Sequence, residues 1–342
     1  MSLKLQTEFP DNHINCIWCV KFHPIKQIFA SCGSDATIII WEYDPSIYNY
    51  KKATILSEVH TKIIRSIDWD CSGKYLSAAS FDNKISIWKM TNNNQPYKFS
   101  CISILDSNDS EIKSVSWSIS GNLIASCSRK GNIWIWERNE DGNEINDEDY
   151  LCKSTFEAHK GDVKMVKFSP REDILFSCSF DETIKIWDFD YSNDDYILIN
   201  TLKNHGGTVW WIEFNKIGDK FFTCSDDKSL IMWKIDFNCE EGDNPYKNIV
   251  KLSTIENMHR RPIYCCVLSM DEKYIFTGSN DEDIGIAEIN GEKMSLINKE
   301  KDAHGQYNVN SICVNKNGKE IISCGDDCCI KIWKFENNNN AN

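Results

Sequence analysis

Short segments in which apolar and polar residues alternate recur along the whole chain. The segments 163–168 (VKMVKF) and 183–187 (TIKIW) are two examples, and both alternate over most of their length. A period of two residues predicts a β-strand with one face turned toward a core. The pattern therefore predicts an all-β protein built from short strands.

These strands belong to a repeat with seven copies, spaced 46 to 54 residues apart. One position of the repeat is occupied by Trp41, Trp88, Trp136, Trp187, Trp233, Ala287 and Trp333. Six residues earlier stand Asp35, Asp82, Lys130, Asp181, Asp227, Asp281 and Asp327. A further 22 residues earlier, or 23 in the last copy, stand His13, His60, Asn108, His159, His205, His259 and His304. Four residues before the Asp position stand Ser31, Ala78, Ser126, Ser177, Thr223, Thr277 and Ser323.

This spacing of His, Ser or Thr, Asp and Trp resembles the WD40 repeat. The resemblance implies a seven-bladed β-propeller, in which each blade is an antiparallel sheet of four strands around a central channel. The last copy stops after its third strand near Trp333, whereas residues 3–9 precede the first copy. We expect this N-terminal segment to form the outer strand of the last blade and close the ring. We expect one domain over residues 1–336, followed by a disordered, Asn-rich tail at residues 337–342.

The recurring His, Asp and Trp superficially resemble a catalytic triad, but a triad occurs once per active site. We predict instead a structural network in each blade, in which the Asp accepts a hydrogen bond from a His that the Ser or Thr and the Trp orient. The predicted network includes His60, Asp82 and Trp88, then His159, Asp181 and Trp187, then His205, Asp227 and Trp233. In the third copy Asn108 and Lys130 replace the His and the Asp, so we expect that blade to lack both ends of the network.

The overall charge narrows the possible functions. The 342 residues carry 38 Lys and Arg against 51 Asp and Glu, a net charge of −13. Such a charge repels phosphate backbones, so we expect no nucleic-acid ligand. No apolar run is long enough for a membrane helix and the N-terminus lacks the pattern of a secretory signal, so we expect a cytoplasmic protein without membrane contact. The sequence also lacks the motifs G-x-x-x-x-G-K-[ST], H-E-x-x-H and G-x-S-x-G, and we predict no enzymatic activity.

The 16 cysteines are predicted to be free thiols in a reducing compartment. Five of them stand nine residues before the repeated Trp, where the other two copies have Ala79 and Gly278: Cys32, Cys127, Cys178, Cys224 and Cys324. A small residue at a fixed place in a strand is typical of burial. Only one C-x-x-C pair occurs, Cys16 to Cys19, so we predict no metal site and no cofactor.

Two positions of the repeat are predicted to converge on one face of the propeller around the channel. The first ring follows the His position by five residues, or by six in the last copy: Trp18, Arg65, Lys113, Lys164, Trp210, Tyr264 and Asn310. The second ring directly precedes the Asp position: Ser34, Phe81, Arg129, Phe180, Asp226, Asn280 and Asp326. Copies two to four give this face a basic arc, and Trp, Tyr and Arg dominate binding hot spots.

We therefore predict that the first ring, together with Arg129, Phe81 and Phe180, binds an acidic or carboxylate-bearing protein partner. The alternative for the aromatic residues is a structural one. In that interpretation Trp18 and Trp210 above all turn inward and plug the channel.

Several stretches are similar to the cytosolic iron-sulfur protein assembly WD40 proteins. These stretches are His60–Trp69, Ser80–Asp82, Glu111–Trp117, Cys127–Arg129, Ile133–Glu137, Gly207–Trp210 and Ile263–Tyr264. The resemblance implies a non-enzymatic adaptor that is monomeric by itself. Its implied partners are a small protein with a reactive cysteine, a HEAT-repeat scaffold and client apo-proteins that receive [4Fe-4S] clusters in the cytoplasm and the nucleus.

The resemblance also assigns a functional role to the exposed Arg of the C-S-R segment, which is Arg129 here. The sequence departs from the family pattern at two places. Lys130 follows this Arg in place of an Asp, and Ile186–Asp188 replaces an L-Y-R type tripeptide that recruits a cochaperone in some members.

Two other functions are compatible with the sequence. The first is a WD40 scaffold or reader in a chromatin or ubiquitin-ligase complex, since one propeller scaffold serves many partners. A histone reader would need an open acidic channel, whereas the predicted ring is basic and aromatic. The second is an enzyme that carries a metal or a cluster on its cysteines, for which the repeat places the thiols in separate blades.

Overall fold

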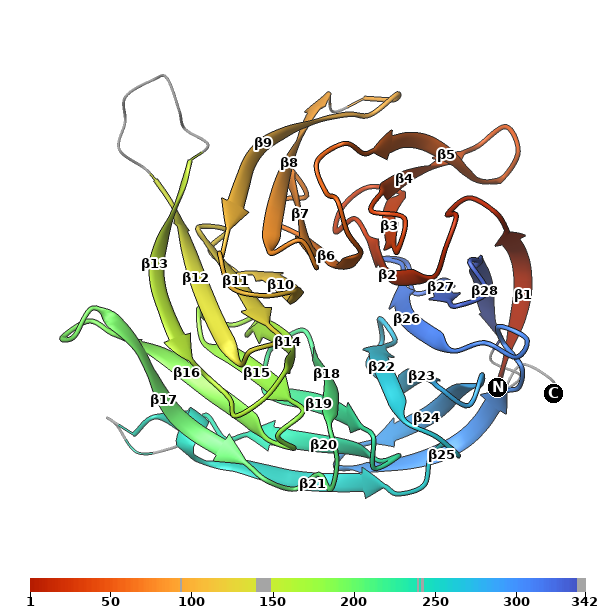
Figure 1. The fold of residues 1–342 in the computed structure, drawn as a ribbon. Coiled ribbons are helices and arrows are strands. Elements are labelled where there is room, and N and C mark those ends of the chain that lie inside the picture. Colours follow the sequence, from red (N-terminus) through yellow and green to blue (C-terminus); the bar gives the residue numbers. More distant parts are fainter. Residues whose placement is uncertain (93, 140–148, 239, 241–242, 337–342) are drawn as a thin grey trace.

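The computed structural model describes residues 1–92, 94–139, 149–238, 240 and 243–336. Within them the chain forms seven four-stranded antiparallel sheets arranged as blades around a central channel (Figure 1). The predicted Asn-rich tail at residues 337–342 lies outside the described residues. The prediction of an all-β, seven-bladed WD40 propeller is confirmed.

Each blade runs outward from the channel. The innermost strands are β2 (Ile17–Phe22), β6 (Ile64–Trp69), β10 (Ile112–Trp117), β14 (Val163–Phe168), β18 (Val209–Phe214), β22 (Ile263–Leu268) and β26 (Val309–Val314). The second strands are β3 (Ile28–Gly33), β7 (Tyr75–Ser80), β11 (Leu123–Ser128), β15 (Leu175–Ser179), β19 (Lys220–Ser225), β23 (Tyr274–Ser279) and β27 (Glu320–Gly325). The third strands are β4 (Ile38–Asp44), β8 (Lys84–Asn92), β12 (Asn132–Arg138), β16 (Ile184–Asp190), β20 (Leu230–Ile235), β24 (Ile284–Asn290) and β28 (Ile330–Glu336). The outer strands are β5 (Asn49–Leu56), β9 (Lys98–Asp106), β13 (Tyr150–Glu157), β17 (Asp195–Leu202), β21 (Ile249–Ile255), β25 (Lys293–Glu300) and β1 (Ser2–Phe9).

The hydrophobic core lies between neighbouring blades. Strands β3, β7 and β11 are buried along their whole length, because each second strand is covered on both faces by an adjoining blade. The apolar cluster between blades four and five, for example, combines Phe176 and Ile186 with Phe221 and Trp233. These second strands are therefore fully covered, while outer strands such as β13 and β25 are mostly exposed or partly buried.

The turn between the second and third strands has the same backbone conformation in every blade. The residue after the Asp position has a positive φ in all seven blades: Ala36, Asn83, Gly131, Glu182, Lys228, Glu282 and Cys328. Glycine occurs there only in blade three, where a Cβ on Gly131 would lie 2.3 Å from the carbonyl oxygen of His159. The next blade approaches this turn so closely that only glycine fits.

The ring is closed by the N-terminal strand. Strand β1 pairs antiparallel with β28, and Leu3 lies opposite Phe335 while Leu5 lies opposite Trp333. Figure 1 shows β1 at the outer edge of the last blade, and Ser2 lies opposite Glu336 in its pairing with β28. The predicted closure of the last blade by the first segment is thus confirmed.

The helical content of the described residues is a single 3-10 turn, η1 (Pro245–Lys247), between β20 and β21. Among the same residues no helix combines the length and the apolarity that crossing a bilayer would require.

Candidate partner-binding face

A β-bulge occurs at the same place in the innermost strand of every blade. In blade one the pairing of β2 with β3 shifts register between Ile17 and Cys19, which leaves Trp18 as the extra residue. A bulge redirects the side chain of the extra residue and interrupts the ladder locally. The seven bulge residues are the first ring: Trp18, Arg65, Lys113, Lys164, Trp210, Tyr264 and Asn310.

The first ring surrounds a cavity of about 240 Å³ at one end of the channel, which we call the mouth cavity. All seven first-ring residues line it, together with Phe81 and Asn308. Sequence reasoning missed Asn308. The available signal was the last copy's extra residue between His304 and Asn310, which lengthens the loop that contains Asn308.

Four blades hold the first-ring side chain through the second-ring residue sixteen positions later. The indole N–H of Trp18 donates to the Ser34 hydroxyl at 2.7 Å, and that of Trp210 donates to the Asp226 carboxylate. The Asn280 amide donates to the Tyr264 hydroxyl at 2.7 Å, and the Asn310 amide donates to Asp326 at 2.7 Å. Trp18 and Trp210 remain partly exposed and form walls of the mouth cavity.

The remaining three blades place cations in the first ring, and their second-ring residues, Phe81, Arg129 and Phe180, offer no side-chain acceptor. The cations lie over aromatic rings instead. The Arg65 guanidinium lies 4.9 Å from the ring centroid of Trp18, and the Lys113 ammonium lies 4.0 Å from that of Phe81. Lys164 lies 4.5 Å from the ring of Trp210, and it also forms an ion pair with Asp162 at 2.7 Å.

Two predicted residues lie outside this cavity. The Arg129 side chain is 64% exposed and pairs with Glu111 at 3.2 Å. Phe180 is 62% exposed, and only the Lys164 ammonium, 6.0 Å from its ring centroid, approaches it from the first ring. Neither residue is part of the cavity lining. The face therefore has a recessed centre and an exposed rim. The spacing of residues in the repeat did not predict which residues belong to the centre and which to the rim.

The space below the first ring is narrow and charged. A cavity of about 30 Å³ there is lined by Lys21, Asp68 and Lys167, among others, and it shares Arg65 and Lys113 with the mouth cavity. Burial raises the pKa of Asp68, while Lys21 opposes the shift. Burial also lowers the pKa of Lys113. The mouth of the channel thus desolvates the Lys113 ammonium.

The His, Asp and Trp marks form a hydrogen-bonded chain in which every group has a partner. In blade four the Trp187 indole N–H donates to the Ser177 hydroxyl at 2.9 Å, and this hydroxyl lies 2.7 Å from His159 Nε2. His159 Nδ1 lies 2.9 Å from Asp181. Because a carboxylate can only accept, His159 carries a proton on Nδ1 and donates it to Asp181; burial lowers the pKa of this histidine, and the neutral ring then accepts at Nε2 from the Ser177 hydroxyl.

The contact between His and Asp recurs in the five other blades that have both residues. The His Nδ1 to carboxylate distances are 2.9 Å for His13 and Asp35, 3.1 Å for His60 and Asp82, 2.8 Å for His205 and Asp227, 2.7 Å for His259 and Asp281, and 2.8 Å for His304 and Asp327. Burial alone would raise the pKa of Asp35 and Asp82. The hydrogen bonds and charge of His13 and His60, together with the backbone N–H groups of Ile14 and Thr61 and further side-chain hydrogen bonds, jointly outweigh burial and lower the pKa of each carboxyl to about 2.

Blade two builds the network with a displaced hydroxyl. Ala78 occupies the usual Ser position, and Ser86, its cross-strand partner in the β7–β8 ladder, supplies the hydroxyl. Ser86 Oγ lies 2.8 Å from His60 Nε2 and accepts the Trp88 indole N–H at 2.8 Å. The hydroxyl has moved across the ladder, and the network of His60, Asp82 and Trp88 is complete.

Blade three lacks the His and the Asp of the network, as expected, and an ion pair that the repeat pattern did not predict replaces them. Asp109, one residue after Asn108, accepts from the Ser128 hydroxyl at 2.9 Å and from the Asn132 amide at 3.2 Å. The Lys130 ammonium lies 3.1 Å from the same carboxylate. The positions of acid and base are thus reversed relative to the other blades. The carboxylate of Asp109 comes from the loop that leads into the blade, and the ammonium of Lys130 comes from the turn between the second and third strands.

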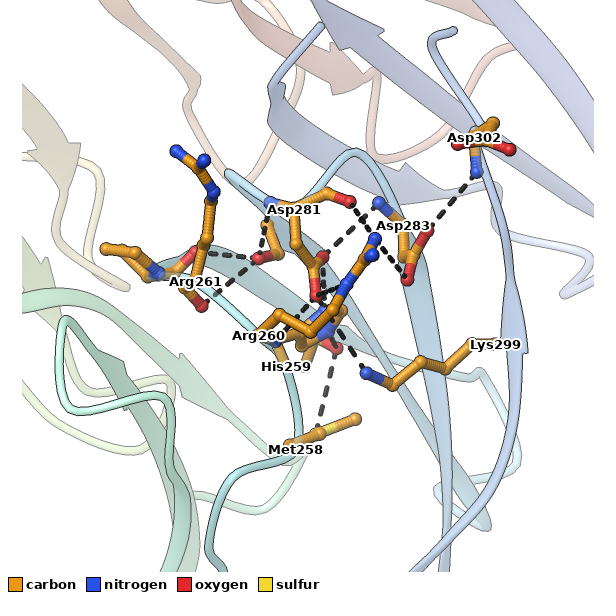
Figure 2. Close-up of polar contacts among 11 residues, drawn as sticks. Met258, His259, Arg260, Arg261, Asp281, Asp283, Lys299 and Asp302 are labelled. Atoms are coloured by element: carbon orange, nitrogen blue, oxygen red, sulfur yellow. Dashed lines mark hydrogen bonds and ion pairs between the residues drawn. The ribbon is translucent and has the colours of Figure 1, made fainter. Parts of the chain in front are cut away.

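Blade six lacks the Trp, and a methionine replaces its contact. The Thr277 hydroxyl lies 2.8 Å from His259 Nε2 and 3.8 Å from the Met258 sulfur, while Ala287 stands at the Trp position. Figure 2 shows Met258, His259 and Asp281 close together with Arg260 and Lys299. A polarizable thioether fills the gap that a missing indole leaves.

The seventh histidine, His23, follows a different pattern and is not a network residue. Its Nε2 lies 2.9 Å from the Gly73 carbonyl oxygen, and its ring packs 4.9 Å from the Trp69 ring. Burial lowers the pKa of His23 to about 4. This neutral imidazole joins blades one and two.

The cysteines that the structure describes are all free thiols. The five that share one repeat position, Cys32, Cys127, Cys178, Cys224 and Cys324, are fully buried. Burial raises the pKa of these thiols, as for Cys127 and Cys224. Among the residues with described positions, no group of three or more His, Cys, Asp or Glu is arranged to hold a metal ion.

The fold and the repeated network define the class of protein. The family model of the WD domain, G-beta repeat, matches residues 4–42, 52–89, 99–137, 150–188, 197–234, 251–286 and 297–334. These seven matches cover most of the chain, one for each blade. The chain belongs to the WD40 repeat family.

Within this family the chain is similar to several curated proteins. It is 36% identical over 103 residues to Protein CIA1 of Arabidopsis thaliana, a match that covers 28% of each chain. It is 23% identical over 188 residues to the probable cytosolic iron-sulfur protein assembly protein 1 of Cryptococcus neoformans, covering 52% of this chain and 38% of that one. A third relative, Protein HIRA of Dictyostelium discoideum, is 32% identical over 180 residues, which are 50% of this chain and 12% of HIRA. The matches thus span less than two fifths of each of these relatives.

Proposed function

We propose that the protein is a non-enzymatic adaptor of cytosolic iron-sulfur protein assembly, which helps to deliver [4Fe-4S] clusters to cytosolic and nuclear apo-proteins. The observation that carries this proposal is the similarity to plant and fungal proteins of which several are named for that process. The cluster is cargo for the client proteins. The proposal places the protein in the cytoplasm.

Six of the seven stretches that resemble the iron-sulfur assembly proteins include a residue of the first or second ring, and the seventh, Ile133–Glu137, lies within strand β12. His60–Trp69, Glu111–Trp117 and Gly207–Trp210 each end in or contain an innermost strand with its bulge residue. Cys127–Arg129 leads to the exposed rim. The stretches also contain buried strand residues, but their repeated inclusion of ring residues supports a shared partner-binding face.

We propose that the rim and the mouth cavity together dock the protein partners of this machinery. These are the small reactive-cysteine protein, the HEAT-repeat scaffold and the client apo-proteins, and the chain is monomeric before it meets them. Arg129 is the rim residue with the clearest role, since its guanidinium is largely exposed and carries only one surface ion pair, with Glu111. A rim charge of this kind acts mainly on the rate and selectivity of docking.

A second candidate is a scaffold in a different assembly, such as a chromatin or ubiquitin-ligase complex. The match to Protein HIRA over half of this chain favours it. The mouth cavity argues against a reader of basic histone side chains, because three cations line it. We therefore rank the iron-sulfur assembly adaptor first.

The test is affinity capture of the tagged protein from its own cells, with bound proteins identified by mass spectrometry. Arg129→Glu is compared with Lys251→Glu, which reverses an exposed charge on the outer strand β21. We expect wild type and Lys251→Glu to recover a reactive-cysteine protein, a HEAT-repeat protein and iron-sulfur enzymes, and Arg129→Glu to recover less of them. Recovery of chromatin or ubiquitin-ligase subunits instead would overturn the function and leave the fold intact.

A further inference from the structure

The polar groups of the first ring differ in whether the protein itself satisfies them. In blades one, five, six and seven, each first-ring side chain has a hydrogen-bond partner in the second ring. Lys164 of blade four has Asp162. Among the described residues, Arg65 and Lys113 have no hydrogen-bond acceptor and no carboxylate at ion-pair distance, only aromatic faces.

Two cations without acceptors in a recessed site are costly in the free protein. Burial and the nearby cations Lys164 and Arg65 lower the pKa of Lys113, against an opposing effect of Asp162. Partly buried charges are normally paired, because desolvation without compensation destabilises the charged form. The mouth cavity is thus charged in a way that an incoming anion would relieve.

We infer that the mouth cavity is a socket for one carboxylate side chain, an Asp or Glu of a protein partner, with Arg65 and Lys113 as its direct ligands. This inference deepens the proposed function and depends on it for the identity of the partner. Arg65 offers several N–H donors in one plane and Lys113 offers a mobile ammonium, which suits the two oxygens of a carboxylate. The walls formed by Trp18, Trp210 and Tyr264 suit the methylene groups of that side chain.

The size of the cavity and its rim favour a protein side chain over a free metabolite. A volume of about 240 Å³ accommodates a side chain with some of its flanking backbone. The rim residues Arg129 and Phe180 are each more than 60% exposed and lie outside the cavity lining. A small molecule inside the cavity would leave this rim uncovered, whereas the remainder of a partner protein would cover it.

The test uses a capped peptide whose only carboxylate is a side chain. Acetyl-Gly-Glu-Gly-amide is titrated into the full chain, and the indole N–H signals of Trp18 and Trp210 are followed by NMR. The matched peptide with Gln removes the charge and keeps the shape. We expect saturable shifts with the Glu peptide, and a dissociation constant at least about tenfold weaker for the Gln peptide, because a charge-assisted hydrogen bond is lost.

Arg65→Gln and Lys113→Gln should each weaken binding of the Glu peptide about tenfold, and Lys251→Gln, on the outer strand, should leave it unchanged. The peptide comparison on the unaltered protein needs no variant, so a folding defect cannot obscure the result. Equal binding of the Gln peptide, no shift at about 10 mM peptide, or displacement by less inorganic phosphate than Glu peptide would each overturn the carboxylate assignment. These results concern the socket alone, and the capture experiment above tests the adaptor function separately.

Discussion

Removal of the Ser86 hydroxyl should be one of the most destabilising changes of a single group in this fold. The hydroxyl is fully buried, lies 2.8 Å from His60 Nε2, and accepts the indole N–H of Trp88 at 2.8 Å. Ser86→Ala therefore leaves two buried polar groups without partners at once. At about 1 to 3 kcal/mol for each such group, the free energy of unfolding should fall by about 2 to 6 kcal/mol.

The geometry also predicts a rescue. Ala78 lies directly opposite Ser86 in the ladder, at the position where the other six blades carry Ser or Thr. Ala78→Ser in the Ser86→Ala background should restore the usual arrangement and recover most of the lost stability. Adding Ala78→Ser to the unaltered protein should gain nothing, since the network is already complete.

Urea unfolding followed by circular dichroism would measure these free energies. The matched control is Ser77→Ala, which removes the hydroxyl of a neighbouring buried serine that makes a single hydrogen bond, to the Asp68 carbonyl oxygen at 3.2 Å. It should cost about 1 kcal/mol. If Ser86→Ala cost no more than this control, or if Ala78→Ser failed to compensate, the account of a displaced hydroxyl would be refuted.

Three further predictions concern the same networks. Asp181→Ala should lower the free energy of unfolding by about 1 to 3 kcal/mol, because it removes the carboxylate that accepts from His159 Nδ1 and from the Lys160 backbone N–H, and an unchanged urea midpoint would contradict this. Lys130→Asp, which restores the commoner residue of the repeat, should destabilise blade three by placing a second carboxylate beside Asp109; a stabilising effect in the same assay would show that the reversed pair is not formed. Acid should unfold the protein through the paired carboxylates: Asp35 and Asp82 have a pKa of about 2, below the unfolded value near 4, so their contribution is complete above about pH 4 and is lost as the pH falls toward 2. A stability that stays constant from pH 5 to about pH 2 would rule out that contribution.

The sequence predicted the fold well because the repeat marks are tied to backbone geometry. Each Asp position directly precedes a residue of positive φ, and each predicted first-ring residue is a bulge residue of an innermost strand. Seven copies of a weak pattern fixed the strand order, and the short last copy indicated the role of β1. Even Ala287, which breaks the Trp pattern, left the sixth blade recognisable by its other marks.

The sequence could not predict the details in which a residue outside the repeat position supplies the functional group that the repeat position lacks. A register argument assigns a role to a position, so it found no hydroxyl at Ala78 and overlooked Ser86 on the facing strand. It correctly gave Asn108 and Lys130 as the loss of the His and the Asp, but it overlooked Asp109, whose carboxylate pairs with Lys130. It also placed Arg129 and Phe180 with the first ring, because the direction of a turn side chain depends on packing that the spacing does not contain.

The central claim is that this propeller serves cytosolic iron-sulfur protein assembly. The most direct measurement is the incorporation of radioactive iron into a cytosolic [4Fe-4S] enzyme and a mitochondrial one, in cells depleted of the chain. The account predicts loss of iron from the cytosolic enzyme with the mitochondrial enzyme unaffected, and recovery on return of the unaltered chain. Normal iron content in both enzymes after depletion would contradict it.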